Sequence, residues 1–126
     1  MASRILIAED EANIVTSLEF LLTAAGYEVA VALDGTEALR LMQSVQPDLV
    51  VLDIMLPAVS GFEVCRRIRG EDAYKDTKIL MLTARGRDAE VERGLAAGAN
   101  AYLTKPFATR ELVRVVEELL AAGGLP

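Results

Sequence analysis

Short apolar segments alternate with amphipathic segments along the whole chain, and this alternation restricts the possible folds more than any other feature. The segments RILIA (4–8), LVVL (49–52) and KILML (78–82) are almost continuously apolar, as are strands of a parallel sheet that is covered on both faces. The segment YEVAVA (27–32) alternates more, as a half-covered edge strand does, and AYL (101–103) is a short fifth strand. The sequence therefore predicts five strands.

Each predicted strand is followed by a segment with helical periodicity. In the first helix Ile14 and Leu18 share a face, and Gly26 is a good C-terminal stop. Asp34 and Glu37 have the spacing of a capping box at the start of the second helix. The apolar positions of the second to fifth helices are Ala38, Leu41, Met42 and Val45; Phe62, Cys65 and Ile68; Val91 and Leu95; and Leu112, Val115, Val116 and Leu119. Because βαβ crossovers are right-handed, the predicted fold is α/β, a doubly wound parallel sheet with helices on both faces.

Length and composition limit the kinds of function that the chain can have. Its 126 residues fit one domain, which we assign to residues 1–121, with 122–126 as a loose C-terminal tail. The net charge of −6 disfavours nonspecific contact with nucleic acid. The sequence contains no histidine, which excludes a His general base, a Ser-His-Asp triad and a His-based zinc site within this chain. Any metal must therefore be bound by oxygen ligands.

The sequence shows no pattern for export or membrane insertion. No apolar run reaches the roughly 18 residues that a transmembrane helix needs, and the N-terminus lacks the basic region and long apolar core of a secretion signal. The single cysteine, Cys65, cannot form an internal disulfide, which agrees with a reducing compartment. We therefore expect a cytoplasmic protein and interpret Cys65 as a small core residue.

Polar side chains follow four of the five predicted strands. The first strand ends at Glu9 and Asp10, the third at Asp53 and the fourth at Thr83, and the fifth leads into Lys105. Ligands of open α/β sheets bind outside the carboxyl ends of the strands, where these side chains should meet. Taken alone, each residue also has an ordinary role: Asp53 and Asp10 as caps, Thr83 in a turn and Lys105 on the surface. The four strand ends at one rim make a shared site the better interpretation.

The residue types at this rim suit the chemistry of phosphoryl transfer. Neighbouring carboxylates repel one another, and a hard cation with oxygen ligands such as Mg²⁺ would relieve this. A carboxylate is also a nucleophile toward phosphorus and gives an acyl phosphate. The transferring group needs positive charge and hydrogen bonds, which the cation, Lys105 and the hydroxyl of Thr83 can supply. No glycine-rich phosphate-binding loop is present, which weakens a nucleotide-binding interpretation.

Four motifs in order resemble those of the receiver domains of bacterial two-component response regulators, the family of the chemotaxis switch protein. ILIAEDE resembles the acidic motif of the first strand, VVLDIMLP the phosphoacceptor motif, MLTA the fourth-strand motif and YLTKPF the last. The order and spacing agree over essentially the whole chain. The resemblance implies a flavodoxin-like (βα)5 three-layer sandwich with strand order 2-1-3-4-5.

The resemblance also implies roles for individual residues. Asp53 would be the phosphoacceptor, and Lys105 would pair with the phosphoryl group. Asp10 would bind Mg²⁺ directly, Glu9 would act at longer range, and the carbonyl oxygen of Met55 would be a backbone ligand. The family typically has a cis bond before the proline that follows the lysine, which is Pro106 here.

Further implied roles concern switching and partner binding. Thr83 and Tyr102 would be the switch pair, although Tyr102 alone reads as a partly buried core aromatic. A histidine-bearing partner, either a sensor histidine kinase or a histidine phosphotransfer protein, would dock on Ile14 and Phe107, with Ser17 one turn further along. Ile14 and Phe107 can also be simple core residues.

The sequence departs from the family pattern at several positions. Glu9 stands where aspartate is commoner, and Ala58 and Ser60 stand where glycine and aspartate are commoner. The segment GANAY lacks the paired acids that precede the last strand in many receivers of winged-helix transcription factors. We therefore expect a monomer or weak dimer rather than their symmetric dimer.

The expected function is a phosphorylatable switch in two-component or phosphorelay signalling, which catalyses only its own phosphorylation and dephosphorylation. Its partners would be the phosphohistidine donor and a protein target, with no nucleic acid and no membrane. Two alternatives remain: a small flavodoxin-like domain that binds flavin or nucleotide, and a receiver-like interaction module that is never phosphorylated.

Overall fold

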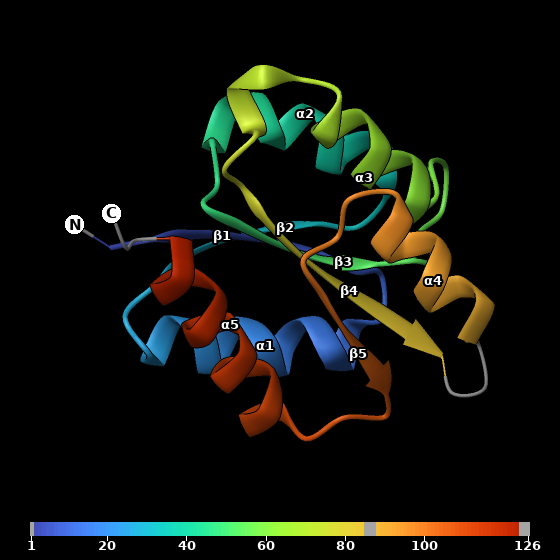
Figure 1. The fold of residues 1–126 in the computed structure, drawn as a ribbon. Helices are drawn as coiled ribbons and strands as arrows, with labels where there is room; N and C mark the ends of the chain where they lie inside the picture. The colour runs from blue at the N-terminus through green and yellow to red at the C-terminus, as the bar shows by residue number, and fades with distance from the viewer. Residues whose placement is uncertain (1, 85–87, 124–126) are drawn as a thin grey trace.

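In the computed structural model, which describes residues 2–84 and 88–123, five parallel strands form one sheet. The strands lie in the order β2-β1-β3-β4-β5, as expected (Figure 1). Their bounds are β1 (Arg4–Ala8), β2 (Glu28–Ala32), β3 (Leu49–Asp53), β4 (Lys78–Ala84) and β5 (Ala101–Lys105). The flavodoxin-like fold is therefore confirmed, and the carboxyl ends of all these strands lie along one edge of the sheet.

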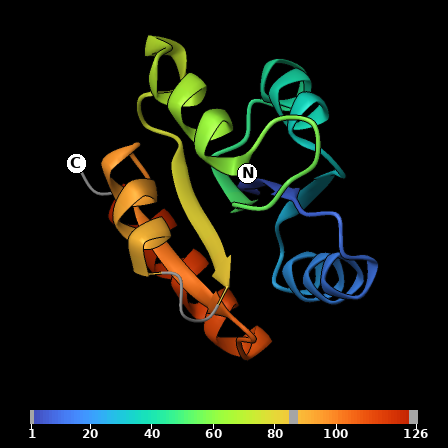
Figure 2. The same cartoon turned by 90° about the vertical axis from the view of Figure 1, so that its right-hand side faces the viewer.

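Helices cover both faces of the sheet. α1 (Ala12–Ala24) and α5 (Thr109–Gly123) lie on one face, and α2 (Gly35–Val45), α3 (Gly61–Arg69) and α4 (Asp88–Ala96) lie on the other (Figures 1 and 2). A short 3-10 turn, η1 (Asp72–Tyr74), precedes β4 and was not expected. α5 continues through Gly123, so it includes the first two residues of the segment 122–126 that was assigned to a loose tail. Within the described ranges, no helix combines the length and the apolar character needed to span a membrane.

Two hydrophobic cores hold the layers together, one on each face of the sheet. Leu6 and Ala8 of β1 belong to the core beneath α2 and α3, whereas Ile5 and Ile7 belong to the core beneath α1 and α5. All four side chains are fully buried. β3 is buried along its whole length, while β2 is only half-buried at the sheet edge. The predicted contrast between covered central strands and a half-covered edge strand is confirmed.

Two helices, α2 and α3, begin with a side-chain cap, and the sequence predicted the cap of α2. Asp34 Oδ1 accepts a hydrogen bond from the Glu37 backbone N–H at 2.7 Å, and Glu37 Oε1 accepts one from the Leu33 backbone N–H at 3.3 Å. Ser60 Oγ accepts one from the Glu63 backbone N–H at 3.3 Å. Ser60 is therefore the N-cap residue of α3. Serine stands here in place of the commoner aspartate, and its side chain still caps the helix.

α4 contacts the sheet differently from the expected pattern. Val91 and Leu95 were predicted as its apolar face, but Leu95 is 44% exposed. The buried residue is Gly94, where an added Cβ would lie 3.3 Å from Met81 Cε. Because glycine has no side chain, α4 approaches the sheet closely at this point and leaves its flanking apolar side chains partly exposed.

In the loop between β3 and α3, one residue, Ala58, has a backbone conformation that is unfavourable for alanine. Ala58 has φ of 69°, in the left-handed region, and the Val59 backbone N–H donates to the Pro57 carbonyl oxygen at 2.8 Å. This i→i+2 bond makes Ala58 the centre of a γ-turn with positive φ, which is rare and strained. Residues with a Cβ adopt this region at a cost, and glycine does so freely.

We expect Ala58→Gly to stabilise the domain by about 0.5–1 kcal/mol, because relief of the strain outweighs the greater entropy of glycine in the unfolded chain. The free energy of unfolding from urea denaturation measures this. Ala24→Gly, at an exposed helical position with ordinary backbone, is the matched control and should lower stability. If Ala58→Gly lowers stability as Ala24→Gly does, the turn at Ala58 is not strained.

Candidate functional site

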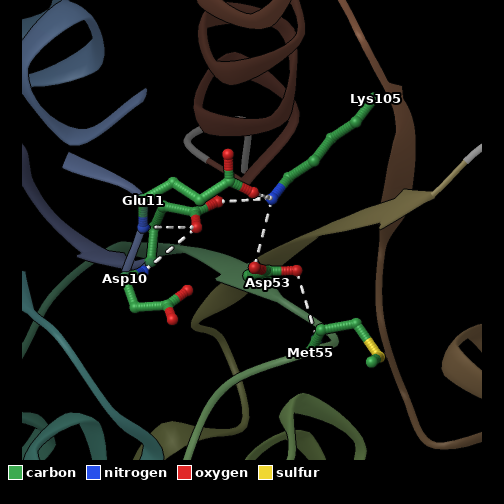
Figure 3. A network of polar contacts seen from close by, with 6 residues as sticks. Asp10, Glu11, Asp53, Met55 and Lys105 are labelled. Carbon is green, nitrogen blue, oxygen red and sulfur yellow. Dashed lines mark hydrogen bonds and ion pairs between the residues drawn. The ribbon is translucent and has the colours of Figure 1, made fainter. Parts of the chain in front are cut away.

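The carboxyl edge of the sheet brings three of the predicted residues into direct contact (Figure 3). Asp53 is the last residue of β3 and is 4% exposed, and Glu9 follows β1 and is fully buried. Lys105, the last residue of β5, places its Nζ 2.8 Å from Glu9 Oε1 and 3.1 Å from Asp53 Oδ2. Two buried carboxylates therefore share one ammonium group.

Both carboxylate oxygens of Glu9 are engaged within the protein. Oε1 faces Lys105, and Oε2 accepts hydrogen bonds from the backbone N–H groups of Asp10 and Glu11, each at 3.0 Å. Burial raises the pKa of Glu9; the hydrogen bonds from Lys105 and the Glu11 backbone oppose this only in part. Glu9 therefore holds in place both the Lys105 side chain and the backbone that follows β1.

Lys105 keeps its positive charge at this site. Burial alone would lower the pKa of its ammonium, but the hydrogen bond to Glu9 and the negative charge of Asp53 outweigh burial and raise the pKa above its ordinary value. A permanent cation thus lies beside the Asp53 carboxylate, where negative charge would develop during phosphoryl transfer.

Glu9, Asp10 and Asp53 form an acidic cluster that could bind a metal ion. One carboxylate oxygen from each lies within 4.8 Å of the others. Asp10 is exposed, unlike the other two, and it does not cap α1, whose N-cap residue is Glu11. These are hard oxygen donors of the kind that Mg²⁺ prefers.

Met55 lies next to Asp53 in the turn that follows β3. Its backbone N–H donates to Asp53 Oδ1 at 3.1 Å, and its side chain is 60% exposed (Figure 3). Asp53 therefore also accepts a hydrogen bond within the turn that follows β3. This matches the capping role that Asp53 could have as an ordinary structural residue. This hydrogen bond fixes one oxygen of Asp53, while the other oxygen faces Lys105.

Glu11 also contacts the site, although the sequence analysis gave it no role. Lys105 Nζ donates to Glu11 Oε1 at 3.1 Å (Figure 3). The run of three acids, Glu9 to Glu11, was the available signal. Only Glu9 and Asp10 were predicted to lie at the rim.

Thr83 and Tyr102 lie on neighbouring strands close to this edge. In the register of β4 and β5, Thr83 pairs with Thr104 and Met81 with Tyr102. Thr83 is 2% exposed, and among the described residues its hydroxyl makes one long contact, 3.5 Å to the Ala84 carbonyl oxygen. Tyr102 is 45% exposed and borders a narrow gap beneath α4, which Met81 also lines.

The predicted docking residues line a groove beside the acidic cluster. Ile14, Ser17 and Phe107 border a groove of about 460 Å³, which Glu11 and Lys105 also line. Ile14 and Phe107 are half-buried and pack against the core beneath α1 and α5 as well. Both interpretations of these two side chains, as core and as groove lining, therefore fit their positions.

The peptide bond between Lys105 and Pro106 is cis, as the family resemblance implied. Cys65 is a buried free cysteine, and burial raises the pKa of its thiol. The burial of Cys65 agrees with the core role expected from the sequence.

Comparison with known proteins identifies the family. A model of the response regulator receiver domain matches residues 5–117. The phosphate regulon transcriptional regulatory protein PhoB of Rhizobium meliloti is 46% identical over 120 residues, which are 95% of this chain and 53% of that protein. The chain thus spans about half the length of the curated relatives it matches.

Two solved structures show the same fold at substantial sequence identity. The chemotaxis response regulator CheY4 of Vibrio cholerae is 34% identical with a TM-score of 0.89, covering 94% of this chain and 99% of that one. The receiver domain of a sensor histidine kinase from Pseudomonas aeruginosa, solved with a magnesium ion in its active site cleft, is 32% identical. Its TM-score is 0.86, over 96% of this chain and 99% of that one. Together with the match to the family model, these similarities show that the chain belongs to the response regulator receiver domain family.

Proposed function

We propose that Asp53 is the residue at which this signalling domain accepts a phosphoryl group, from a phosphohistidine on a partner protein. The observation that carries the proposal is the buried Asp53 carboxylate at the end of β3, with Lys105 Nζ 3.1 Å from one oxygen. Asp10 adds an exposed carboxylate beside it. The resulting switch would be no enzyme beyond its own phosphorylation and dephosphorylation.

The residues fit an in-line transfer in which atoms and charge balance. An oxygen of Asp53 attacks phosphorus and forms the O–P bond, while the P–N bond to the partner's imidazole breaks. The imidazole leaves with the electron pair and takes up a proton. Lys105 stays protonated and stabilises the charge on the phosphoryl oxygens. Attack of water on the acyl phosphate later returns the free carboxylate and inorganic phosphate.

The acidic cluster fits a Mg²⁺ ion of the kind present in the related Pseudomonas aeruginosa receiver domain. Asp10 and Asp53 would hold it directly and the Met55 carbonyl would be a backbone ligand. Glu9 would act at longer range, because both of its oxygens already have partners. When bound, the ion neutralises negative charge on the approaching phosphoryl oxygens.

The groove between α1 and the loop after β5 is the proposed docking surface for the histidine-bearing partner. Ile14 and Phe107 offer apolar contacts there, and Ser17 extends the surface along α1. Lys105 lines the same groove, so a partner seated in it brings its histidine close to Asp53. A sensor histidine kinase or a histidine phosphotransfer protein would fit this role.

Thr83 and Tyr102 are the proposed link between Asp53 and an output surface formed by α4, β5 and α5. A phosphoryl group adds acceptor oxygens near the Thr83 hydroxyl, whose contact with the Ala84 carbonyl oxygen is long, at 3.5 Å. As that hydroxyl moves toward them it vacates space behind it, which the large, amphipathic side chain of Tyr102 on the neighbouring strand can fill. A partner that binds one of the two arrangements more tightly would then respond to phosphorylation of Asp53.

The proposed output of these residues is a protein contact. PhoB is a transcriptional regulatory protein, but this chain matches only about half of it. We therefore confine the expectation of no nucleic-acid contact to these residues, whose net charge is −6. A cytoplasmic location and a monomeric or weakly dimeric state belong to the same proposal, the first supported by the buried free thiol of Cys65.

Asp53→Asn should abolish phosphorylation by acetyl phosphate in Mg²⁺, because an amide cannot form the acyl phosphate. Intact-mass measurement of the acid-stabilised protein detects the added phosphoryl group. Asp76→Asn, which removes an exposed carboxylate at the opposite edge of the sheet, should be labelled as wild type is. Full labelling of Asp53→Asn at another residue would refute the assignment.

Asp10→Ala should weaken Mg²⁺ binding about tenfold or more, because an octahedral site with few protein ligands loses one of them. Titration of backbone amide NMR signals with Mg²⁺ measures the dissociation constant. Asp76→Ala is the matched control, with the same loss of charge away from the cluster. Equal Mg²⁺ affinity of Asp10→Ala and Asp76→Ala would show that Asp10 is no ligand.

Thr83→Ala should still accept a phosphoryl group but should lose most of the response of α4 and α5. NMR shifts of these helices with and without beryllofluoride measure the response. Thr77→Ala removes another buried hydroxyl just before β4, at the opposite edge, and should leave the response intact. If Thr83→Ala shows the wild-type shifts, Thr83 is not the coupling residue and Tyr102 is a packing residue.

A further inference from the structure

We propose that Glu11 is a positioning residue that holds Lys105 in the resting domain and releases it when a phosphoryl group arrives. The strength of this contact would then set how readily the domain takes up the phosphoryl group. The inference rests on the proposed function of Asp53 and adds a residue to it.

The ammonium group of Lys105 already contacts carboxylates in the resting structure: it donates hydrogen bonds to Glu11 and Asp53 and forms an ion pair with Glu9. An ammonium carries three N–H donors. Three carboxylate oxygens lie within reach of Nζ, those of Glu9 at 2.8 Å, Glu11 at 3.1 Å and Asp53 at 3.1 Å. A phosphoryl oxygen that approaches Lys105 therefore competes with these carboxylates for its ammonium group.

The cost of release differs greatly among the three carboxylates. The Glu9 side chain is fully buried, so loss of Lys105 would leave a buried charge without its counterion. Asp53 is the residue that carries the phosphoryl group, so it stays beside Lys105. The Glu11 side chain is 61% exposed, and its carboxylate can exchange Lys105 for water at little cost. Glu11 is thus the exchangeable partner.

The residue type at position 11 supports a role outside the helix. Glu11 is the N-cap residue of α1, a position at which Ser, Thr, Asp and Asn are preferred, and its side chain makes no capping hydrogen bond. The side chain instead reaches a lysine 94 residues away in the sequence. Aspartate would be the better cap, but it is one methylene shorter and would not reach Lys105.

Beryllofluoride binding to the full chain in Mg²⁺ tests the inference with four proteins: wild type, Glu11→Gln, Glu11→Asp and Glu19→Gln. Both Glu11 variants should bind beryllofluoride about two- to fivefold more tightly, as expected for removal of a competing exposed ion pair. Glu19→Gln removes the same charge from an exposed position on the same helix and should bind as wild type does. NMR titration of backbone amides measures the affinity.

The NMR signals of the Lys105 side chain in metal-free protein provide a second measurement that is independent of binding. These signals should shift in both Glu11 variants and stay unchanged in Glu19→Gln.

The Glu11→Asp variant separates the contact with Lys105 from effects of charge and of helix capping. Aspartate keeps the negative charge and is a better N-cap residue for α1, but its shorter side chain cannot reach Lys105. The inference is overturned if Glu11→Asp matches wild type, since charge alone would then explain Glu11→Gln. It is also overturned if Glu11→Gln binds as wild type does. A wild-type protein that binds no beryllofluoride would instead overturn the proposed function of Asp53, and the release of Lys105 with it.

Discussion

The ammonium of Lys105 between two buried carboxylates is the interaction on which the site depends. Glu9 and Asp53 lie at the ends of adjacent strands, and burial of two neighbouring carboxylates without a counterion would be costly. Lys105 comes from β5, which is separated from β3 by β4. Its long stem reaches past the end of β4, and this lets one charge neutralise two strand ends. The Asp53 carboxylate therefore has a counterion 3.1 Å away.

The sheet holds these groups in place because its central strands are covered on both faces. β3 is buried along its length and Ile5 to Ala8 of β1 are fully buried, so the residues that follow them have little freedom. The same burial explains why the fold could be predicted. Continuous apolar runs mark covered parallel strands, and the convergence of their carboxyl ends places Glu9, Asp53 and Lys105 together without knowledge of side-chain positions.

Other features could not be predicted because they depend on contacts between distant segments. In the local sequence Glu11 is simply a residue next to the start of a helix. Its contact with Lys105 forms only because the fold brings β5 close to it. The close approach of α4 at Gly94 depends on the Met81 side chain beneath it. Alanine itself does not favour the positive φ of the γ-turn at Ala58, and the glycine that is commoner there in the family was the available signal. In each case the local sequence favours a different role from the one that the tertiary structure imposes.

In the proposed switch α4 is one of the elements that must change position. A phosphoryl group at Asp53 can shift an equilibrium only by its differential interaction with two states, which is limited to a few kcal/mol. The element that moves must therefore be held by few contacts. Among the described residues, α4 packs through the buried Gly94 and through Arg93, whose guanidinium lies 4.2 Å from the centre of the Phe62 ring. Leu95 and Tyr102 remain half-exposed at its border, so another position of α4 could bury apolar surface that the present one leaves in water.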